Sequence, residues 1–199
     1  MDTIPTSTQF LLNSYSDVNS TGETYIAYLF AGDSPDSVRF DGTGDWITTG
    51  QGNMWTFGTG DFTVECWVKF DKSDTEEGVY QNGGTSTGFA TMNYGSTPSV
   101  GHNQSNWVVF GGSSGNNQEF GGGTRNANQW YHIAHVRNSG TTKLYVDGVE
   151  AISFSDSTNY QGNRAVIGGY YSSSYTLEGN ITNFRVVKGT AVYTSAFTP

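Results

Sequence analysis

Residues Phe62 to Phe70 alternate without interruption between apolar and mostly polar side chains, and this pattern constrains the fold more than any other feature of the sequence. Successive side chains of a β-strand point to opposite faces of its sheet. The apolar face of the predicted strand consists of Phe62, Val64, Cys66, Val68 and Phe70. Cys66 is the only cysteine, so we expect a small buried thiol and no intramolecular disulfide.

Short runs of β-branched and aromatic residues recur along the chain between clusters of Gly, Asn, Asp and Ser. Asp147-Gly148 is the strongest hairpin signal among them. Between Ile181 and Phe184 the apolar side switches, which a β-bulge at Thr182-Asn183 or a central strand covered on both faces would explain. Ala191 to Tyr193 is predicted to finish the sheet. No stretch has convincing helical periodicity, so we predict an all-β fold.

A chain of 199 residues is compatible with one large β-sandwich. The breaker cluster Gly32 to Asp36 suggests a boundary near Ser34. We therefore predict a region of N-terminal strands, 1–34, compatible with the end of a preceding repeat domain, and a main domain at 35–199.

The formal net charge of −9 argues against binding to nucleic acid and to anionic lipid. The nine basic residues are spread along the chain without a cluster. No run approaches the roughly 20 apolar residues of a membrane span, and no signal peptide is visible. The composition is compatible with solubility and with calcium binding.

Five segments occur in the order found in the laminin-G-like branch of the concanavalin A-like superfamily, which they resemble: Val38 to Trp46, Gly60 to Val68, Trp130 to Ala134, Lys143 to Gly148 and Gly179 to Arg185. The resemblance covers about residues 36 to 188. It implies a two-sheet antiparallel jelly-roll sandwich, a fold that hosts lectins, glycan hydrolases and adhesion modules.

Two further segments resemble parts of tail-fibre-like proteins of marine bacteriophages. Asn19 to Ala31 is similar to the closing strand of a repeat in those proteins, and Leu177 to Tyr193 is similar to their laminin-G-like domains. The resemblance implies a virion protein, with a secreted bacterial protein as the alternative.

Glycan hydrolysis would need two acidic residues that flank the scissile bond. Laminarinase-type relatives place them as Glu-x-Asp-x-Glu along one strand, and none of the seven glutamates here forms such an array. Glu76 and Glu77 are interpreted as a solvated charge run. His132 and His135 are three positions apart on a strand, so they face opposite sides and cannot share a metal there. We predict that the chain is not an enzyme.

A structural calcium ion is the one cofactor that the sequence suggests. Asp41, Gly42, Asp45 and Asn183 lie in segments that resemble those building such a site in relatives, and Ca²⁺ favours carboxylate and carbonyl oxygens. Many relatives carry Asp where Asn183 stands, and an amide would weaken the site. The alternative is that these residues form turn hydrogen bonds only.

Exposed aromatic rings could stack on sugars, and five of them are candidates for ligand binding: Tyr170, Tyr171, Tyr175, Trp107 and Tyr94. The first three form the best candidate patch, in a stretch otherwise made of Gly, Ser and Thr. The alternative for each ring is packing over the edge of the sandwich.

We therefore predict a non-enzymatic binding or assembly module of a phage virion protein, such as a tail fibre, an adhesin or a surface decoration. Its expected partners are a host cell-surface glycan or other virion proteins, and it could form an oligomer in the full assembly. A secreted bacterial lectin or glycan hydrolase, and a spacer without any ligand, are the alternatives.

Overall fold

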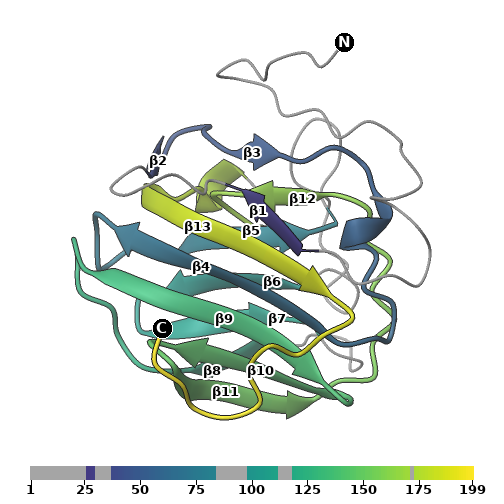
Figure 1. Cartoon of the computed structure of the whole chain (residues 1–199). Helices are drawn as coiled ribbons and strands as arrows, with labels where there is room; N and C mark the ends of the chain where they lie inside the picture. Colours follow the sequence, from purple (N-terminus) through teal and green to yellow (C-terminus); the bar gives the residue numbers. More distant parts are fainter. Residues whose placement is uncertain (1–25, 30–36, 84–97, 112–117, 171–172) are drawn as a thin grey trace.

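The fold is all-β and consists of two antiparallel sheets packed face to face, as predicted (Figure 1). The computed structural model describes residues 26–29, 37–83, 98–111, 118–170 and 173–199. Within this part of the chain, no helix is long and apolar enough to span a membrane.

The front sheet has the order β1-β13-β4-β9-β10-β11, and β2 also pairs with β13. Its strands are β1 (Ile26–Leu29), β2 (Val38–Asp41), β4 (Phe62–Phe70), β9 (Trp130–Asn138), β10 (Thr141–Val146), β11 (Val149–Ser155) and β13 (Glu178–Lys188). The long strand β13 pairs with β2 along its first residues and with β1 along its later ones. β1 therefore belongs to this sheet, and the boundary expected near Ser34 lies outside the described residues.

The back sheet has the order β3-β12-β5-β6-β7-β8. Its strands are β3 (Ile47–Thr48), β5 (Glu77–Asn82), β6 (Ser99–Asn103), β7 (Asn106–Phe110), β8 (Gln118–Gly121) and β12 (Ala165–Ile167). Two short 3₁₀ turns, η2 (Asn53–Trp55) and η3 (Ser173–Tyr175), lie in the connections.

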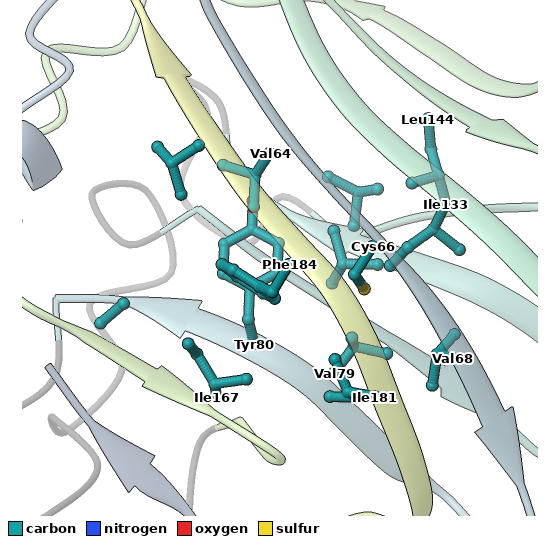
Figure 2. Packing of buried hydrophobic residues seen from close by; sticks show 14 of the residues in the cluster. Val64, Cys66, Val68, Val79, Tyr80, Ile133, Leu144, Ile167, Ile181 and Phe184 are labelled. Atoms are coloured by element: carbon teal, nitrogen blue, oxygen red, sulfur yellow. The ribbon is translucent and has the colours of Figure 1, made fainter. Parts of the chain in front are cut away.

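The core lies between the sheets and is lined by the inward side chains of both (Figure 2). Val64, Cys66 and Val68 of β4 face Val79 and Tyr80 of β5, and all five are at most 1 % exposed. The alternation of β4 is therefore confirmed. Burial raises the pKa of the Cys66 thiol far above its usual value, so the group is an inert thiol.

The switch of apolar side within β13 is produced by a β-bulge, one of the two predicted explanations. The register with β4 shifts between Thr182 and Arg185, and Asn183 has a left-handed backbone with φ of 51°. Ile181 and Phe184 consequently both point into the core, although three positions separate them.

The prediction of a strand at Ala191 to Tyr193 is wrong. Residues 189–199, the C-terminal segment, leave β13 and cross the outer face of the front sheet without joining it (Figure 1). The Val192 amide donates to Thr63 Oγ1 at 2.9 Å, and the Phe197 amide donates to the Gly148 carbonyl at 3.0 Å. The apolar pattern there reflects packing on the sheet, because β13 is already paired on both sides.

Candidate functional site: a loop rim at one end of the sandwich

Three connections meet at the end of the sandwich where β4 finishes. They are the turn 41–45, the loop 71–77 and the residues 168–170 and 173–176. We call these three connections together the loop rim. Thr176 Oγ1 donates to the Gly42 carbonyl at 2.8 Å, and the Tyr170 hydroxyl donates to Glu76 Oε1 at 2.5 Å. These bonds join parts of the chain that lie more than 90 residues apart. The turn that carries the calcium candidates and the loop that carries the tyrosine candidates are thus neighbours.

The buried side chain of Arg125 anchors the loop 71–77 of the loop rim. Its fully buried guanidinium donates to the carbonyls of Lys72 and Thr75, each at 3.0 Å, and forms an ion pair with Glu77. Its charged carbon lies 3.9 Å from the ring centroid of Phe70, a cation–π contact. A single side chain therefore fixes the path of the loop 71–77.

Glu77 is not part of a solvated charge run, contrary to the expectation from its neighbour Glu76. It is 3 % exposed at the start of β5, and its Oε1 accepts the Glu178 amide at 2.8 Å. Burial raises the pKa of Glu77, an effect that the Glu178 amide and the Arg125 guanidinium oppose. Sequence alternation could not show this, because the partner Arg125 lies 48 residues away.

His102 is a buried residue of β6. Its Nε2 lies 3.1 Å from the Gly123 carbonyl, and its ring packs edge-on against Trp107. Burial, with Arg125 nearby, lowers the pKa of His102 to about 4, so the ring is neutral at pH 7.

Trp107 cannot offer a face to a sugar in this structure. It lies in β7, faces the core and is 1 % exposed, with Phe70 and Tyr131 packed edge-on against its ring. The expectation that its ring is exposed was wrong, because Trp107 lies within β7, which begins one residue before it. Tyr94 and Tyr171 lie outside the described residues.

Tyr170 packs over the outer face of the back sheet, as the packing alternative expected. It is 1 % exposed and contacts Val108 and Phe110. The close approach requires glycine beneath the ring: a Cβ atom on Gly78 would lie 2.0 Å from Tyr170 Cδ1, and one on Gly101 would lie 2.4 Å from Cε1.

Tyr175 is the accessible aromatic side chain among the described residues of this patch. Its half-buried ring stacks on Tyr170 with centroids 5.7 Å apart and an interplanar angle of 19°. The exposed residues Ser173 and Ser174 precede it in η3. A ring supported by Tyr170, with serine hydroxyl groups next to it in the chain, has the chemical character of a sugar-binding residue.

The calcium candidates divide into two groups. In the turn after β2, the Thr43 amide donates to Asp41 Oδ1 at 2.7 Å and the Asp41 amide to Asp45 Oδ2 at 3.4 Å. Asp41 pairs with Glu178 on β13, whereas Asn183 lies five positions further along, on the order of 15 Å away at the rise of a strand. Asn183 therefore does not join the turn.

Calcium binding remains a prediction for Asp41, Gly42 and Asp45 alone. Among the residues that the structure describes, no three His, Cys, Asp or Glu side chains are grouped to hold a metal ion. An ion at this turn would thus depend on carbonyl oxygens and water for most of its ligands.

Each glutamate whose side chain is described has a partner. Glu65 contacts Arg185 and His132, Glu77 contacts Arg125, and the remaining pairs are Glu76 with Tyr170, Glu150 with Lys143 and Glu178 with Lys72. His132 faces Glu65 on the outer side of β9, while His135 faces Tyr80 in the core, so the prediction that the two histidines point apart is confirmed.

Comparison with known proteins places this geometry in a family. The family model described as "Concanavalin A-like lectin/glucanases superfamily" matches residues 41–192. The comparison with curated proteins found no match.

Among solved structures, a CBM40 domain of the Ruminococcus gnavus IT-sialidase bound to α2,3-sialyllactose is similar with a TM-score of 0.59 and 11 % identity, over 80 % of this chain and 92 % of that one. Domain 4 of AbnA, an extracellular arabinanase of Geobacillus stearothermophilus, in complex with arabinotriose, matches with a TM-score of 0.52 and 19 % identity, over 84 % and 77 %.

The Trypanosoma rangeli sialidase in complex with the inhibitor DANA matches with a TM-score of 0.57 and 16 % identity. That match covers 84 % of this chain but only 27 % of the sialidase. At these identities the likeness concerns the fold alone. The matched region and the two-sheet topology agree, and the chain belongs to the concanavalin A-like lectin/glucanase superfamily.

Proposed function

We propose that this domain is a non-enzymatic glycan-recognition module of a phage virion protein, such as a tail fibre, an adhesin or a surface decoration, and that the loop rim is its contact surface. The partner is a host cell-surface glycan. A neighbouring subunit of the same assembly, which would make the domain part of an oligomer, is the second partner that this location allows.

The observation that carries the proposal is the Tyr175 ring stacked on Tyr170. Tyr170 is itself fixed by its bond to Glu76, and Glu76 belongs to the loop that Arg125 holds. Ligand sites that are formed before binding lose little entropy on binding. A half-buried tyrosine on such a support suits the apolar face of a sugar ring.

A binding role is favoured over hydrolysis by the state of the acidic side chains. A glycosidase keeps one carboxyl group free to donate a proton and a second one a fixed distance from it. The glutamates at the loop rim are occupied instead: Glu77 by Arg125 and the Glu178 amide, and Glu178 by Lys72 at 2.5 Å. A secreted bacterial lectin has the same requirements at the site, so it remains the alternative for location.

Tyr175→Ala tests the proposal, with Tyr175→Phe as the matched control. We expect the Ala variant to lose about 1–2 kcal/mol of binding free energy for host cells or purified host polysaccharide. The Phe variant keeps the ring, so it should bind within about twofold of the parent, an effect below the usual hot-spot size. Calorimetry and adsorption assays measure the binding, and urea unfolding measures stability.

A loss of stability with intact adsorption in Tyr175→Ala would show that the ring is only a packing residue. Turnover of β-glucan, agar or sialoside that disappears in Glu65→Gln or Glu178→Gln would overturn the non-enzymatic assignment.

A further inference from the structure

A polar groove lies on the outer face of the front sheet, beside the C-terminal segment. It has a volume of about 430 Å³ and runs between Val136 on β9, Lys143 on β10, Ser153 on β11 and Tyr193 of the C-terminal segment. Ligand sites commonly occupy a few hundred to a thousand cubic ångströms, so one small ligand would fit.

The groove is at the opposite end of the sandwich from the loop rim. The turn from Asn138 to Thr141 contributes to its lining, and Arg137, just before this turn, pairs with Phe62, the first residue of β4. The loop rim follows Phe70, the last residue of β4, on the order of 25 Å away at the rise of a strand. The two surfaces can therefore be tested separately.

One wall of the groove is a tight hairpin. Ser139 and Gly140 have φ values of 49° and 78°, as a type I′ turn requires. The Ser139 amide donates to Asp61 Oδ1 at 2.8 Å, which ties the turn to the residue before β4. This wall is formed before any ligand arrives.

Tyr193 forms the facing wall and is fixed from beneath. Arg185 Nη2 donates to its hydroxyl at 3.4 Å, and burial together with the hydrogen bond to Glu65 raises the pKa of Tyr193 to about 12. Phe197 stacks on one face of the ring, with centroids 3.6 Å apart and planes within 7°. Tyr193 lines the groove, whereas Phe197 does not.

The lining is rich in hydroxyl and amide groups and its charge is balanced. Ser139, Thr141, Ser153 and Thr194 contribute hydroxyl groups, and Asn138 contributes an amide. Lys143 is the one charged residue among the described residues that line the groove, and its ammonium group lies 2.7 Å from Glu150 Oε2. Such a surface offers many directional hydrogen bonds and little net charge.

We propose that this groove is a second carbohydrate site, independent of the loop rim, which takes a neutral oligosaccharide with one sugar ring against Tyr193. Hydroxyl and amide side chains pair with sugar hydroxyls, and the aromatic ring contacts the C–H face of the sugar. The balanced Lys143–Glu150 pair gives a carboxylated sugar no advantage, and the net charge of −9 opposes one.

The test is an NMR titration of the full chain with lactose, maltotriose and arabinotriose at millimolar concentration, with α2,3-sialyllactose as the charged comparator. We expect at least one neutral sugar to shift the amide resonances of Thr141, Lys143 and Ser153 saturably. Ser153 is exposed on an edge strand, so Ser153→Trp should fill the groove, leave the fold intact and weaken binding by about tenfold or more, because the ligand volume is occupied.

Ser105→Trp is the matched control, since Ser105 is exposed in the turn between β6 and β7, away from the groove. It should bind as the parent does. Tyr175→Ala should also leave the groove shifts unchanged, which separates this site from the loop rim. No saturable shift with any neutral sugar, or shifts that survive Ser153→Trp, would overturn the site. Binding of sialyllactose alone that is lost in Lys143→Met would overturn its assignment to neutral sugars.

Discussion

The two ends of β4 share one arrangement, a buried arginine over a phenylalanine ring, but the surroundings of this arrangement differ. Phe62 and Phe70, its first and last residues, each lie under a buried arginine: Arg137 at 5.3 Å and Arg125 at 3.9 Å from the ring centroids. Each guanidinium donates hydrogen bonds to carbonyl groups of nearby loops. Arg137 donates to the carbonyls of Gly60 and Thr158, each at 2.8 Å, and to that of Gly58 at 2.7 Å.

The acids beside the two arginines differ. At the Phe62 end, Asp156 is fully enclosed and accepts hydrogen bonds from Thr142 at 2.6 Å and Tyr160 at 2.8 Å. Burial alone would raise the pKa of Asp156, but these hydrogen bonds outweigh burial and hold it below the usual value.

At the Phe70 end, the arginine-bound acid Glu77 follows Glu76 in the chain, and Glu76 accepts a hydrogen bond from Tyr170, on which Tyr175 stacks. The first end therefore closes the sandwich, whereas the second holds in place the loops of the proposed contact surface. A buried arginine can thus stabilise the fold at one end of a strand and preorganise a surface at the other.

The largest expected effect is at the closed end. Arg137→Met removes the charge that faces Asp156, and it should destabilise the fold by about 4–5 kcal/mol, as the loss of one partner of a buried pair does. Urea unfolding measures the loss. Adding Asp156→Asn should recover part of it, because no buried charge is then left alone. A loss below about 1 kcal/mol, the size of a surface ion pair, would contradict the structural role of Arg137.

Arg125→Met should cost slightly less, about 3–4 kcal/mol, for the same reason. Glu77 would keep the Glu178 amide as a partner and is closer to water, being 4 % exposed in its side chain. This variant, unlike Arg137→Met, should also weaken binding at the loop rim. Equal binding by the two variants, measured by calorimetry below their melting temperatures, would remove the functional difference between the ends.

Acid should weaken both ends, because each contains a buried neutral histidine. Burial lowers the pKa of His135 to about 3 and that of His102 to about 4, against 6.5 in the unfolded chain. Below pH 6.5 the unfolded state binds more protons than the folded state. The free energy of unfolding therefore has its full value above pH 6.5 and decreases as the pH falls. The contribution of His102 to this decrease ends near pH 4, and that of His135 ends near pH 3.

Each histidine should contribute a slope of about 1.4 kcal/mol per pH unit. Urea unfolding across this pH range measures how steeply the free energy of unfolding depends on pH. This slope should be smaller in His102→Gln than in the parent, by the contribution of one histidine. An unchanged slope would show that His102 is not buried as a neutral ring.

The smallest effect concerns calcium. If the turn at Asp41 and Asp45 binds the ion, millimolar Ca²⁺ should raise the melting temperature by about 2–4 °C relative to EDTA, through binding to the native state. Asp41→Asn should abolish that rise. Asn183→Gly should leave it unchanged, because Asn183 does not lie at the turn. Identical melting curves with calcium and EDTA would end the calcium proposal.

Local patterns were sufficient to predict much of the fold. The alternation of β4, the Asp147-Gly148 hairpin and the bulge at Asn183 each depend on a few consecutive residues. Asp147 and Gly148 have the positive φ values of 50° and 77° that a type I′ turn needs. Short-range backbone preference thus determines these features.

The candidate site could be predicted only in part, because its contacts join distant residues. From the sequence, Glu77 is expected to be a surface charge, because no local pattern shows that Arg125 lies beside it. Tyr170 is likewise expected to be exposed, because no local pattern shows that Gly78 and Gly101 lie under its ring. The sequence gives a weak indication that Arg137 is buried, since Arg137 continues the inward positions of β9 after His135. It gives no such indication for Arg125, because this residue stands alone among turn residues.

We propose that the loop rim contacts the host glycan, independently of the groove that lies near Arg137. Hydrogen exchange of the full chain, with and without purified host surface polysaccharide, tests it most directly. The account predicts slower exchange of amides in 41–45 and 173–176, with the amides around Arg137 at 58–62 and 156–160 unchanged. Unchanged exchange in 41–45 and 173–176 when the polysaccharide is bound, whether or not amides near Arg137 are slowed, would contradict binding at the loop rim.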